Sequence, residues 1–330
     1  MGKPEIEELV IAAIESRKSW IAELNTDSYR LFHGVAEGAP GVTVDRYASE
    51  VVVQVFRASL EEDWQSLAEC IQDSQEGVTA VRIVRRGKGK EVLATAGELA
   101  ERTECNEEGC KFWNSFGQVG NDPWFYLDFR SSRRFVANVA KDARVANFFS
   151  YTGTAAVVAA KAGAKSVSNI DFGRWCLDVA KENCELNGVK SRIVKDDFFS
   201  VARQWAGGQA KNRRRGGSGA RREASYKPES FDLVILDPPT RSNGPNGAVD
   251  ILRDYPSLAK PCVQMVAEGG WLLCTHHHTG LGFDEWQGIV HRTADKIGRT
   301  VLESQRIVPD KDFPIVGEEP LLKVLAVKLG

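Results

Sequence analysis

The 330-residue sequence has no long apolar run and almost no net charge. Its longest apolar stretches are strand-sized, well short of the ~20 residues that a membrane-spanning helix needs. Lysine and arginine number 43 against 45 acidic residues, so overall charge gives no argument for nucleic-acid binding and any basic surface must be local. The N-terminus is acidic and lacks the apolar core of a secretory signal and the Arg/Ser bias of a transit peptide. We therefore expect a cytoplasmic protein without membrane contact.

Paired cysteines are also missing. The seven cysteines are scattered and odd in number, which argues against a disulfide scaffold in a chain of this size. Cys105 and Cys110 are too widely spaced for the usual zinc knuckle and have no second pair nearby. The histidines 276–278 are not expected to bind one metal together either, because adjacent residues of an extended segment point in alternate directions. We expect no metal; this run supplies a base, stacks on nucleotides or is a plain surface loop.

The hydrophobic period changes near residue 110. Residues 1–110 begin with an amphipathic helix over 4–25, followed by short alternating strands and one more helix, which predicts a small α+β domain. Residues 111–330 alternate strands with helices, which predicts a Rossmann-like, mostly parallel sheet. The strands are expected at 145–149, 166–171, 191–196, 231–237 and 270–275, the helices at 154–163, 173–187 and 255–267, and an antiparallel closing pair at 301–308 and 322–329.

One segment interrupts this alternation. Residues 207–226 are rich in glycine and arginine, and 207–222 contain no acid, so we interpret them as a flexible basic insertion. The insertion leads into the N-terminal end of the 231–237 strand, whereas ligands bind at carboxyl ends. It either adds non-specific phosphate attraction or is a solvated loop.

The turn after the first core strand reads Ser150-Tyr151-Thr152-Gly153-Thr154. It has one glycine instead of the three that a dinucleotide's pyrophosphate requires. S-adenosyl-L-methionine has no phosphate, so this turn suits it. Gly153 would let the backbone approach the cofactor, and Thr152 and Thr154 would offer hydroxyls and helix N-terminal amides to its carboxylate. The alternative is an ordinary strand–helix turn.

Carboxylates follow the next two strands. Asp171 comes roughly 20 residues after the turn, where it would accept the ribose hydroxyls, with Phe172 beside it; its alternative role is a helix N-cap. Asp197 would accept the adenine amino group and Phe198 would flank the ring, although one of the aspartates at 196 and 197 could be only a cap.

Upstream, Asp128 and Arg130 precede the first core helix. Arg130 would meet the cofactor carboxylate and Asp128 its ammonium. The alternative is an ion pair that holds the domain entrance in place.

A second pocket is expected at Asp237-Pro238-Pro239-Thr240, at the carboxyl end of the fourth strand. The two prolines stiffen the loop and present carbonyls instead of N–H donors. Such a rim suits the edge of a planar base beside the methyl donor, so these residues are the candidate catalytic set.

Several motifs together carry a family resemblance. They are Leu31-Phe32-His33-Gly34, Pro40-Gly41-Val42-Thr43-Val44-Asp45-Arg46-Tyr47, Tyr126-Leu127-Asp128-Phe129-Arg130, Asn147-Phe148-Phe149-Ser150-Tyr151-Thr152-Gly153 and Asp237-Pro238-Pro239-Thr240 with Ser242-Asn243. From about residue 29 onward the chain resembles bacterial large-subunit ribosomal RNA methyltransferases that modify cytosine C5 or guanine N7. The resemblance implies S-adenosyl-L-methionine, an RNA substrate and a class I methyltransferase domain.

The sequence departs from the cytosine-C5 type in three ways. That type carries an N-terminal PUA module, which we expect to be lacking here because the matching text begins near residue 29. It usually has lysine after the prolines, whereas Thr240 with Ser242-Asn243 is more similar to the guanine-N7 type. Its cysteine lies among small hydroxyl residues, whereas Cys274 lies in an apolar run.

The acceptor atom depends on that cysteine. Methylation of cytosine C5 needs a thiolate to add at C6, and Cys274 is the nearby candidate, although buried cysteines are usually inert. Guanine N7 has a lone pair and needs only proximity, orientation and charge stabilisation. Both routes stay open at the level of the sequence.

We expect an enzyme, monomeric or homodimeric, that methylates a base of ribosomal RNA. The N-terminal domain would grip RNA through Arg82, Arg85, Arg86, Lys88 and Lys90, or these residues form a solvated strand edge. The alternatives are a methyltransferase acting on a small metabolite or protein side chain, and a non-catalytic RNA-binding protein.

Overall fold

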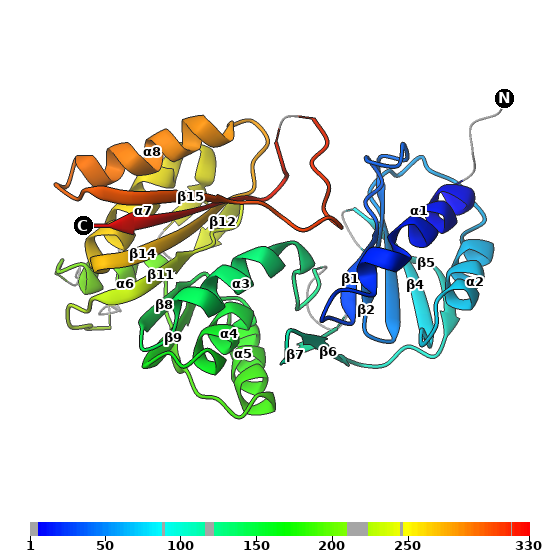
Figure 1. Ribbon diagram of the computed structural model, residues 1–330, viewed down its shortest axis with the longest axis horizontal. Helices are drawn as coiled ribbons and strands as arrows, with labels where there is room; N and C mark the ends of the chain where they lie inside the picture. Colours follow the sequence, from blue (N-terminus) through cyan, green and yellow to red (C-terminus); the bar gives the residue numbers. More distant parts are fainter. Residues whose placement is uncertain (1–5, 88–89, 116–121, 210–223, 245–246, 318) are drawn as a thin grey trace, which may run out of the picture. The chain divides into compact units, whose positions relative to one another are not determined.

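The computed structural model describes residues 6–87, 90–115, 122–209, 224–244, 247–317 and 319–330, with the backbone alone for 90, 242–244 and 247–249. Contacts divide the chain into two units (Figure 1). Residues 1–130 and 309–320 form the first, and residues 131–308 and 321–330 the second. The boundary predicted at 110 falls inside a hairpin of the first unit, because β6 (Thr103–Glu107) pairs with β7 (Cys110–Asn114).

The first unit is built on a five-stranded sheet in the order β1-β2-β3-β4-β5. Its strands are antiparallel except for the parallel pair β3–β4. Apolar faces of α1 and α2 pack on this sheet, with Val10, Ile14, Leu67 and Ile71 buried in a common core. The elements are α1 (Ile6–Ile21), β1 (Ser28–Phe32), β2 (Val42–Tyr47), β3 (Glu50–Val55), α2 (Trp64–Ser74), β4 (Ala80–Arg86), β5 (Lys90–Gly97) and a 3₁₀ turn, η1 (Leu127–Phe129).

The second unit contains the predicted Rossmann-like sheet, with strand order β10-β9-β8-β11-β14-β16-β15. The strands from β10 to β14 are parallel, and β16 lies antiparallel between β14 and β15, which confirms the expected closing pair. The strands are β8 (Arg144–Phe148), β9 (Ser166–Asp171), β10 (Arg192–Lys195), β11 (Phe231–Leu236), β14 (Val266–His276), β15 (Val301–Ile307) and β16 (Lys323–Leu329).

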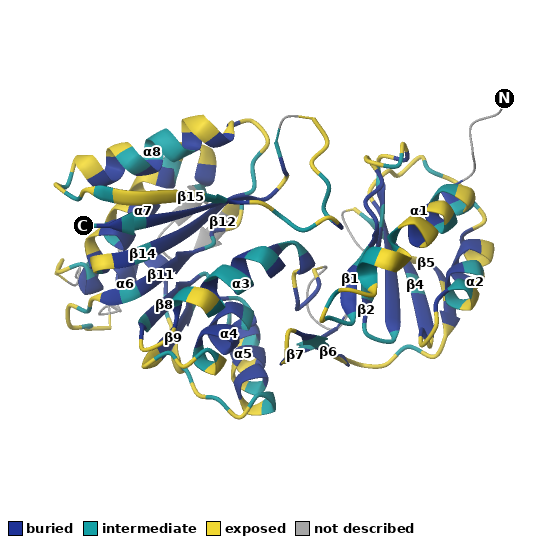
Figure 2. Cartoon of the chain, in the orientation of Figure 1, coloured by how far each residue is buried: buried dark blue, intermediate teal, exposed yellow. Residues whose placement is uncertain are grey.

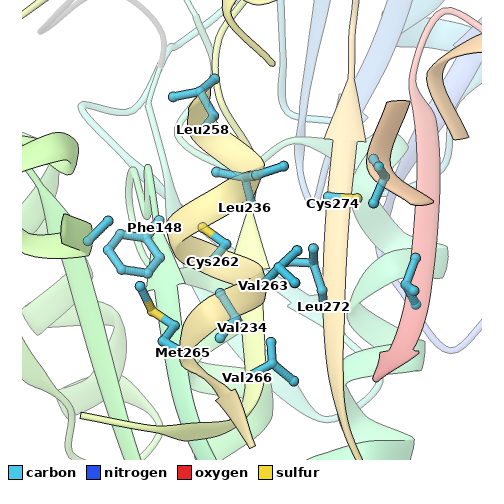
Figure 3. Packing of buried hydrophobic residues seen from close by; sticks show 14 of the residues in the cluster. Phe148, Val234, Leu236, Leu258, Cys262, Val263, Met265, Val266, Leu272 and Cys274 are labelled. Atoms are coloured by element: carbon cyan, nitrogen blue, oxygen red, sulfur yellow. The ribbon is translucent and has the colours of Figure 1, made fainter. Parts of the chain in front are cut away.

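Helices cover both faces of this sheet. On one face α6, α7 and α8 pack in sequence, and their apolar side chains join alternate residues of the strands in one core. Figure 3 shows Cys262, Val263 and Met265 of α7 against Phe148 and Val234 of the sheet. Neighbouring strand residues such as Leu233 and Ile235 are buried but do not belong to that core, because successive side chains of a strand point to opposite faces of the sheet. The helices are α3 (Arg130–Val139), α4 (Thr154–Lys161), α5 (Arg174–Leu186), α6 (Phe198–Trp205), α7 (Ile251–Met265) and α8 (Phe283–Asp295).

Helix α6 and two hairpins were not predicted from the sequence, and one of these hairpins is β6–β7. The buried residues of helix α6 follow helical spacing at Phe198, Val201, Ala202 and Trp205. This pattern could have predicted the helix from the sequence. The hairpin of β12 (Arg241–Gly244) and β13 (Gly247–Asp250) follows the double proline and leads directly into α7. Within the basic insertion, residues 210–223 lie outside the described part of the chain.

Candidate active site

The predicted site residues of the second unit gather at one edge of its sheet. Strands β10, β9, β8, β11 and β14 are adjacent and parallel, so their carboxyl ends lie side by side. The interiors of β8 and β11 are buried and dark blue in Figure 2, and the residues that follow the strands at this edge include partly exposed ones such as Tyr151, Asp237 and His277. The residues that follow the strand ends are 149–153 after β8, 172–173 after β9, 196–197 after β10, 237–240 after β11 and 277–278 after β14.

The turn after β8 has unusual backbone geometry. Phe149, Tyr151 and Gly153 have positive φ angles of 55°, 49° and 72°, and two of the three are not glycine. A left-handed conformation costs a non-glycine residue ~1–2 kcal/mol, so something must hold the turn. The next strand does so, because Ser150 N donates to Ile170 O at 3.1 Å and Tyr151 N donates to Asp171 Oδ2 at 3.1 Å. Strain that is over-determined in this way is found at ligand sites.

Gly153 has a packing role that the sequence did not reveal. A Cβ at this position would lie 2.8 Å from Ala180 Cβ on α5 and 3.1 Å from Asn169 Nδ2 on β9. Glycine is therefore required for close packing of the turn on α5 as well as for its positive φ. It is also the N-cap of α4 and has no side chain to cap the first-turn amides, so these can bind an anion.

The two threonines flank that glycine. Thr152 is buried, and its carbonyl accepts a hydrogen bond from Asn183 Nδ2 at 2.9 Å. Thr154 is half-buried and begins α4. Ser150 is buried, and among the described residues its hydroxyl has no hydrogen-bond partner. The predicted contacts of these residues with the cofactor stay predictions.

Asp171 lies between two loops of the edge. Its Oδ2 accepts from Tyr151 N, and its Oδ1 accepts from Gly173 N at 2.8 Å. The N-cap of α5 is Gly173, so the capping alternative for Asp171 is not what the structure shows. Burial raises the pKa of Asp171, and the amides of Gly173 and Tyr151 act in the opposite direction. Each oxygen keeps accepting capacity for a ribose hydroxyl. Phe172, the next residue, is 44% exposed.

The two aspartates after β10 have different roles. Asp197 is the N-cap of α6, and its Oδ1 accepts from Phe199 N at 3.0 Å. Of the two aspartates, the one that caps a helix is therefore the one predicted to bind adenine. Asp196 is half-buried; its Oδ2 accepts from the Tyr226 hydroxyl at 3.0 Å. Phe198 is buried and stacks on Phe149 with ring centroids 5.0 Å apart. Adenine binding near Asp197 and Phe198 stays a prediction.

Tyr226 lies at this edge of the sheet, although no sequence motif indicated it. Gln204 on α6 donates through Nε2 to Ala224 O and accepts from Tyr226 N through Oε1, at 3.0 and 2.9 Å. The chain therefore re-enters the fold after the basic insertion on the side of β10, with the Tyr226 hydroxyl at the carboxyl edge. Burial and the bond to Asp196 raise the pKa of Tyr226 to about 12.

The cofactor role predicted for Arg130 is wrong. Its guanidinium is 1% exposed and donates from Nε to Glu107, from Nη1 to Asp310 and Asp312, and from Nη2 to Asp312 and Ser28 O, at 2.8–3.2 Å. All five N–H donors of an arginine are thereby used. The ion-pair alternative is correct, and Arg130 is a buried hub of the first unit. Asp128 in η1 is half-buried, and its predicted contact with the cofactor ammonium stays a prediction.

Asp237 is positioned by the neighbouring strand. Its Oδ1 accepts from the hydroxyl of Thr275, and His277 Nε2 lies 3.1 Å from the same oxygen. Leu236 pairs with Cys274 across β11 and β14, so residues 237 and 275 directly follow a matched pair. The side chains of Asp237 and His277 are 31% and 35% exposed, whereas Thr275 is buried. Pro238 is buried, Pro239 is exposed and Thr240 is half-buried, so the outer proline forms the accessible rim.

The structure contradicts a nucleophilic role for Cys274. The residue is fully buried within β14, and its Sγ lies 3.5 Å from Leu325 O (Figure 3). Burial raises the pKa of the Cys274 thiol to about 12, so thiolate is scarce at neutral pH. The remaining six cysteines are free; five are buried and Cys70 is half-buried in the first unit.

The three consecutive histidines lie in three different environments. His276 is fully buried between the rings of Tyr255 and Trp286. Burial lowers its pKa to about 4, helped by the nearby positive charge of Lys323. His277 alone reaches Asp237, and the ring of His278 accepts through Nδ1 from Gly280 N at 2.8 Å. No cluster of metal-ligating side chains occurs among the residues that the structure describes, which leaves the expectation of no metal without a contrary observation.

Two of the basic residues expected to grip RNA in the first unit, Arg85 and Arg86, are engaged with acids. Strand β4 lies between β3 and β5, so it is not a sheet edge. Arg85 pairs with Glu61 and Glu91, and Arg86 pairs with Asp122. Paired in this way, Arg85 and Arg86 offer little free positive charge to RNA phosphates, so the ion pairs do not favour the predicted contact. Lys88 lies outside the described residues, and only the backbone of Lys90 is described.

Three comparisons bear on the chain as a whole. A family model described as S-adenosylmethionine-dependent methyltransferase matches residues 29–327. The ribosomal RNA large subunit methyltransferase I of Enterobacter sp. (strain 638) is 31% identical over 314 residues, which cover 92% of this chain and 74% of that protein. The crystal structure of a putative methyltransferase complexed with SAH has a TM-score of 0.81 at 20% identity and covers 99% of this chain and 83% of its own.

A further solved structure extends the similarity of fold. The M. jannaschii tRNA m1G37 methyltransferase has a TM-score of 0.58 at 17% identity, covering 100% of this chain and 80% of its own. At such identities the structural likeness shows the fold alone. Among the described helices, none has both the length and the apolar character to cross a membrane.

Proposed function

The chain belongs to the S-adenosylmethionine-dependent methyltransferase family, and from that premise we propose that it methylates a base of ribosomal RNA at a ring nitrogen. The family membership rests on a model that spans most of the chain and on a relative above 30% identity. It makes the protein an enzyme and leaves the non-catalytic alternative without support. The substrate proposal follows the names of the relatives, and the choice of nitrogen follows from the burial of Cys274.

The residues at the carboxyl edge fit an S-adenosylmethionine molecule. The uncapped amides at the start of α4 suit its carboxylate, and the Asp171 carboxylate suits its ribose hydroxyls. With the carboxylate and the ribose placed in this way, the adenine would lie beside Asp197 and Phe198. When bound, the cofactor supplies an electrophilic methyl group. The protein's own contribution is to fix these donors and acceptors before binding, which the strained turn and its bonds to β9 accomplish.

The target base would enter beside Pro238 and Pro239. A proline carbonyl accepts but its nitrogen cannot donate, so this rim recognises N–H groups at a base edge. Asp237 and His277 lie at the same place, and their pairing through Nε2 holds the imidazole in one orientation. A base in a duplex must leave the stack to reach such a rim, so an unpaired or flipped nucleotide is the expected substrate.

The single observation that supports a nitrogen acceptor is the burial of Cys274. Cytosine C5 needs a covalent thiolate adduct, and none of the chain's seven cysteines is an exposed thiol. A ring nitrogen with a lone pair, of which guanine N7 is the example closest to the sequence motifs, needs only orientation at the edge. The pair of Asp237 and His277 provides that orientation.

The test is mass mapping of modified nucleosides in ribosomal RNA from a deletion strain, complemented with the wild type or with Cys274→Ala. We expect loss of 7-methylguanine and full restoration by both genes, because the buried thiol takes no part in transfer. Loss of 5-methylcytosine that Cys274→Ala fails to restore, although the variant protein is folded and abundant, would overturn the nitrogen assignment. An unchanged modification profile would overturn the ribosomal substrate and favour a metabolite or a protein side chain.

A further inference from the structure

A basic surface groove lies between α7 and α8, away from the strand ends that form the candidate active site. Its volume is about 250 Å³. Both helices start from the carboxyl edge of the sheet and end at the opposite edge, where β14 and β15 begin. Three cations, Lys260, Arg292 and Lys296, line this α7–α8 groove together with the apolar Pro256, Ile289 and Ile297.

The three cations of the groove are exposed and lack acidic partners. None of Lys260, Arg292 and Lys296 forms an ion pair or a side-chain hydrogen bond with any residue in the described part of the chain. Some exposed cations elsewhere on the same unit are paired, as Arg253 is with Asp254 and Lys181 with Glu185, whereas others, such as Lys190 and Lys227, are not paired with any described acid. Asp295 adjoins Lys296 in sequence but does not line the groove. Three unneutralised like charges on one surface attract a polyanion.

The groove is connected to the candidate substrate rim by the helix itself. Ile251, the first residue of α7, donates its N–H to Thr240 O at 3.3 Å, immediately after the double proline. Lys260 follows nine residues later, which is ~14 Å along a helix that rises ~1.5 Å per residue. A single strand of RNA with one base at the rim would reach the groove within a few nucleotides.

We propose that the α7–α8 groove binds the phosphodiester backbone of the RNA strand next to the methylated nucleotide. The inference rests on the proposed function, and it assigns RNA binding to the catalytic unit instead of to the arginines of β4. Lysine and arginine side chains neutralise phosphates by charge, without reading bases. The apolar floor formed by Ile289 and Ile297 gives sugar faces a surface to contact.

The experiment compares two charge-matched double variants of the full chain. Lys260→Gln with Lys296→Gln removes two groove cations, and Lys141→Gln with Lys181→Gln removes two exposed lysines from the loop before β8 and from α5. Binding of a ribosomal RNA fragment is measured by anisotropy from 0.05 to 1 M salt. Calorimetry with S-adenosylhomocysteine checks that both variants keep the cofactor site.

Counterion release sets the expected size of the effect. Each phosphate contact to a single strand contributes ~0.7 to the slope of log K against log salt, so the groove variant should lose about 1.4 from that slope. Extrapolated from equal affinity at 1 M, this corresponds to about 25-fold weaker binding at 0.1 M salt. The control variant should keep the wild-type slope.

The outcomes separate this inference from the proposed function. A groove variant with the slope and affinity of a wild type that does bind and methylate RNA would overturn the groove alone. A wild type that binds cofactor but neither binds nor methylates RNA would overturn the proposed function and the groove with it. Displacement of RNA from the wild type, but not from the groove variant, by low millimolar inorganic phosphate would overturn the backbone assignment in favour of a single-phosphate site.

Discussion

Replacing Gly153 with alanine tests whether the turn after β8 is shaped by packing on α5. Two costs are expected. The φ of 72° is left-handed and costs an alanine ~1–2 kcal/mol. The new Cβ would lie 2.8 Å from Ala180 Cβ and 3.1 Å from Asn169 Nδ2, and such overpacking costs ~1–3 kcal/mol. The free energy of unfolding should therefore fall by about 2–5 kcal/mol.

Gly188→Ala is the matched control. Gly188 has a φ of 66° in the same unit, but a Cβ there would meet nothing within 4 Å. It should show the backbone cost alone, ~1–2 kcal/mol. Urea unfolding followed by tryptophan fluorescence gives both free energies, and their difference isolates the contact with α5.

A second substitution identifies the contacting atom. Ala180→Gly removes the Cβ that the new side chain would meet, so the double variant Gly153→Ala with Ala180→Gly should recover ~1–3 kcal/mol relative to the sum of the single changes. The double variant should bind S-adenosylhomocysteine with an affinity within a few-fold of the wild type, because the new Cβ of residue 153 points into the interface between the turn and α5. Equal losses for Gly153→Ala and Gly188→Ala, or no recovery in the double variant, would refute the packing argument.

Two further predictions concern the buried ionisable side chains of Arg130 and His276. Arg130→Met leaves the buried Glu107 and Asp312 and the half-buried Asp310 without their cation, so the free energy of unfolding of the first unit in urea should fall by ~3–5 kcal/mol. Calorimetry should show unchanged affinity for the cofactor. A specific loss of cofactor affinity with normal stability would restore the role predicted from the sequence. His276 has a pKa lowered to about 4, below the ordinary ~6.5, so its contribution to stability is present above pH 6.5 and is lost as the pH falls toward 4, by up to about 3 kcal/mol. His276→Phe should flatten that part of the unfolding curve against pH, and an unchanged pH dependence would show that His276 titrates normally in the fold.

The accuracy of the sequence interpretation varied with the range of the interactions involved. The βα alternation was predictable because buried strands and amphipathic helices leave periodic patterns within a dozen residues. The same local patterns placed Gly153, Asp171, Asp197 and Asp237 at or just after strand ends, and parallel neighbours then brought them to one edge. Even α6 was within reach, since its four buried residues follow helical spacing.

Arg130 illustrates an interaction that local sequence patterns do not predict. Its position before the first core helix suggested a cofactor contact, but its main partner, Asp312, is 182 residues away in the sequence. Tyr226 and Asp196 are 30 residues apart, with the basic insertion between them. Pairings of this kind leave no periodic signal, so a single sequence does not show which charges are already used.

The sequence by itself determined most of the order of elements, the family and the edge of the sheet on which the candidate site lies, because strand and helix periodicity and strand-end motifs are local properties of the chain. The tertiary structure alone decided which candidates are available there. It buried Cys274, enclosed Arg130 in carboxylates, gave Asp197 to a helix cap and set His277 against Asp237. The physical reason is that pKa and hydrogen-bonding capacity depend on burial and on partners that folding brings from distant parts of the chain.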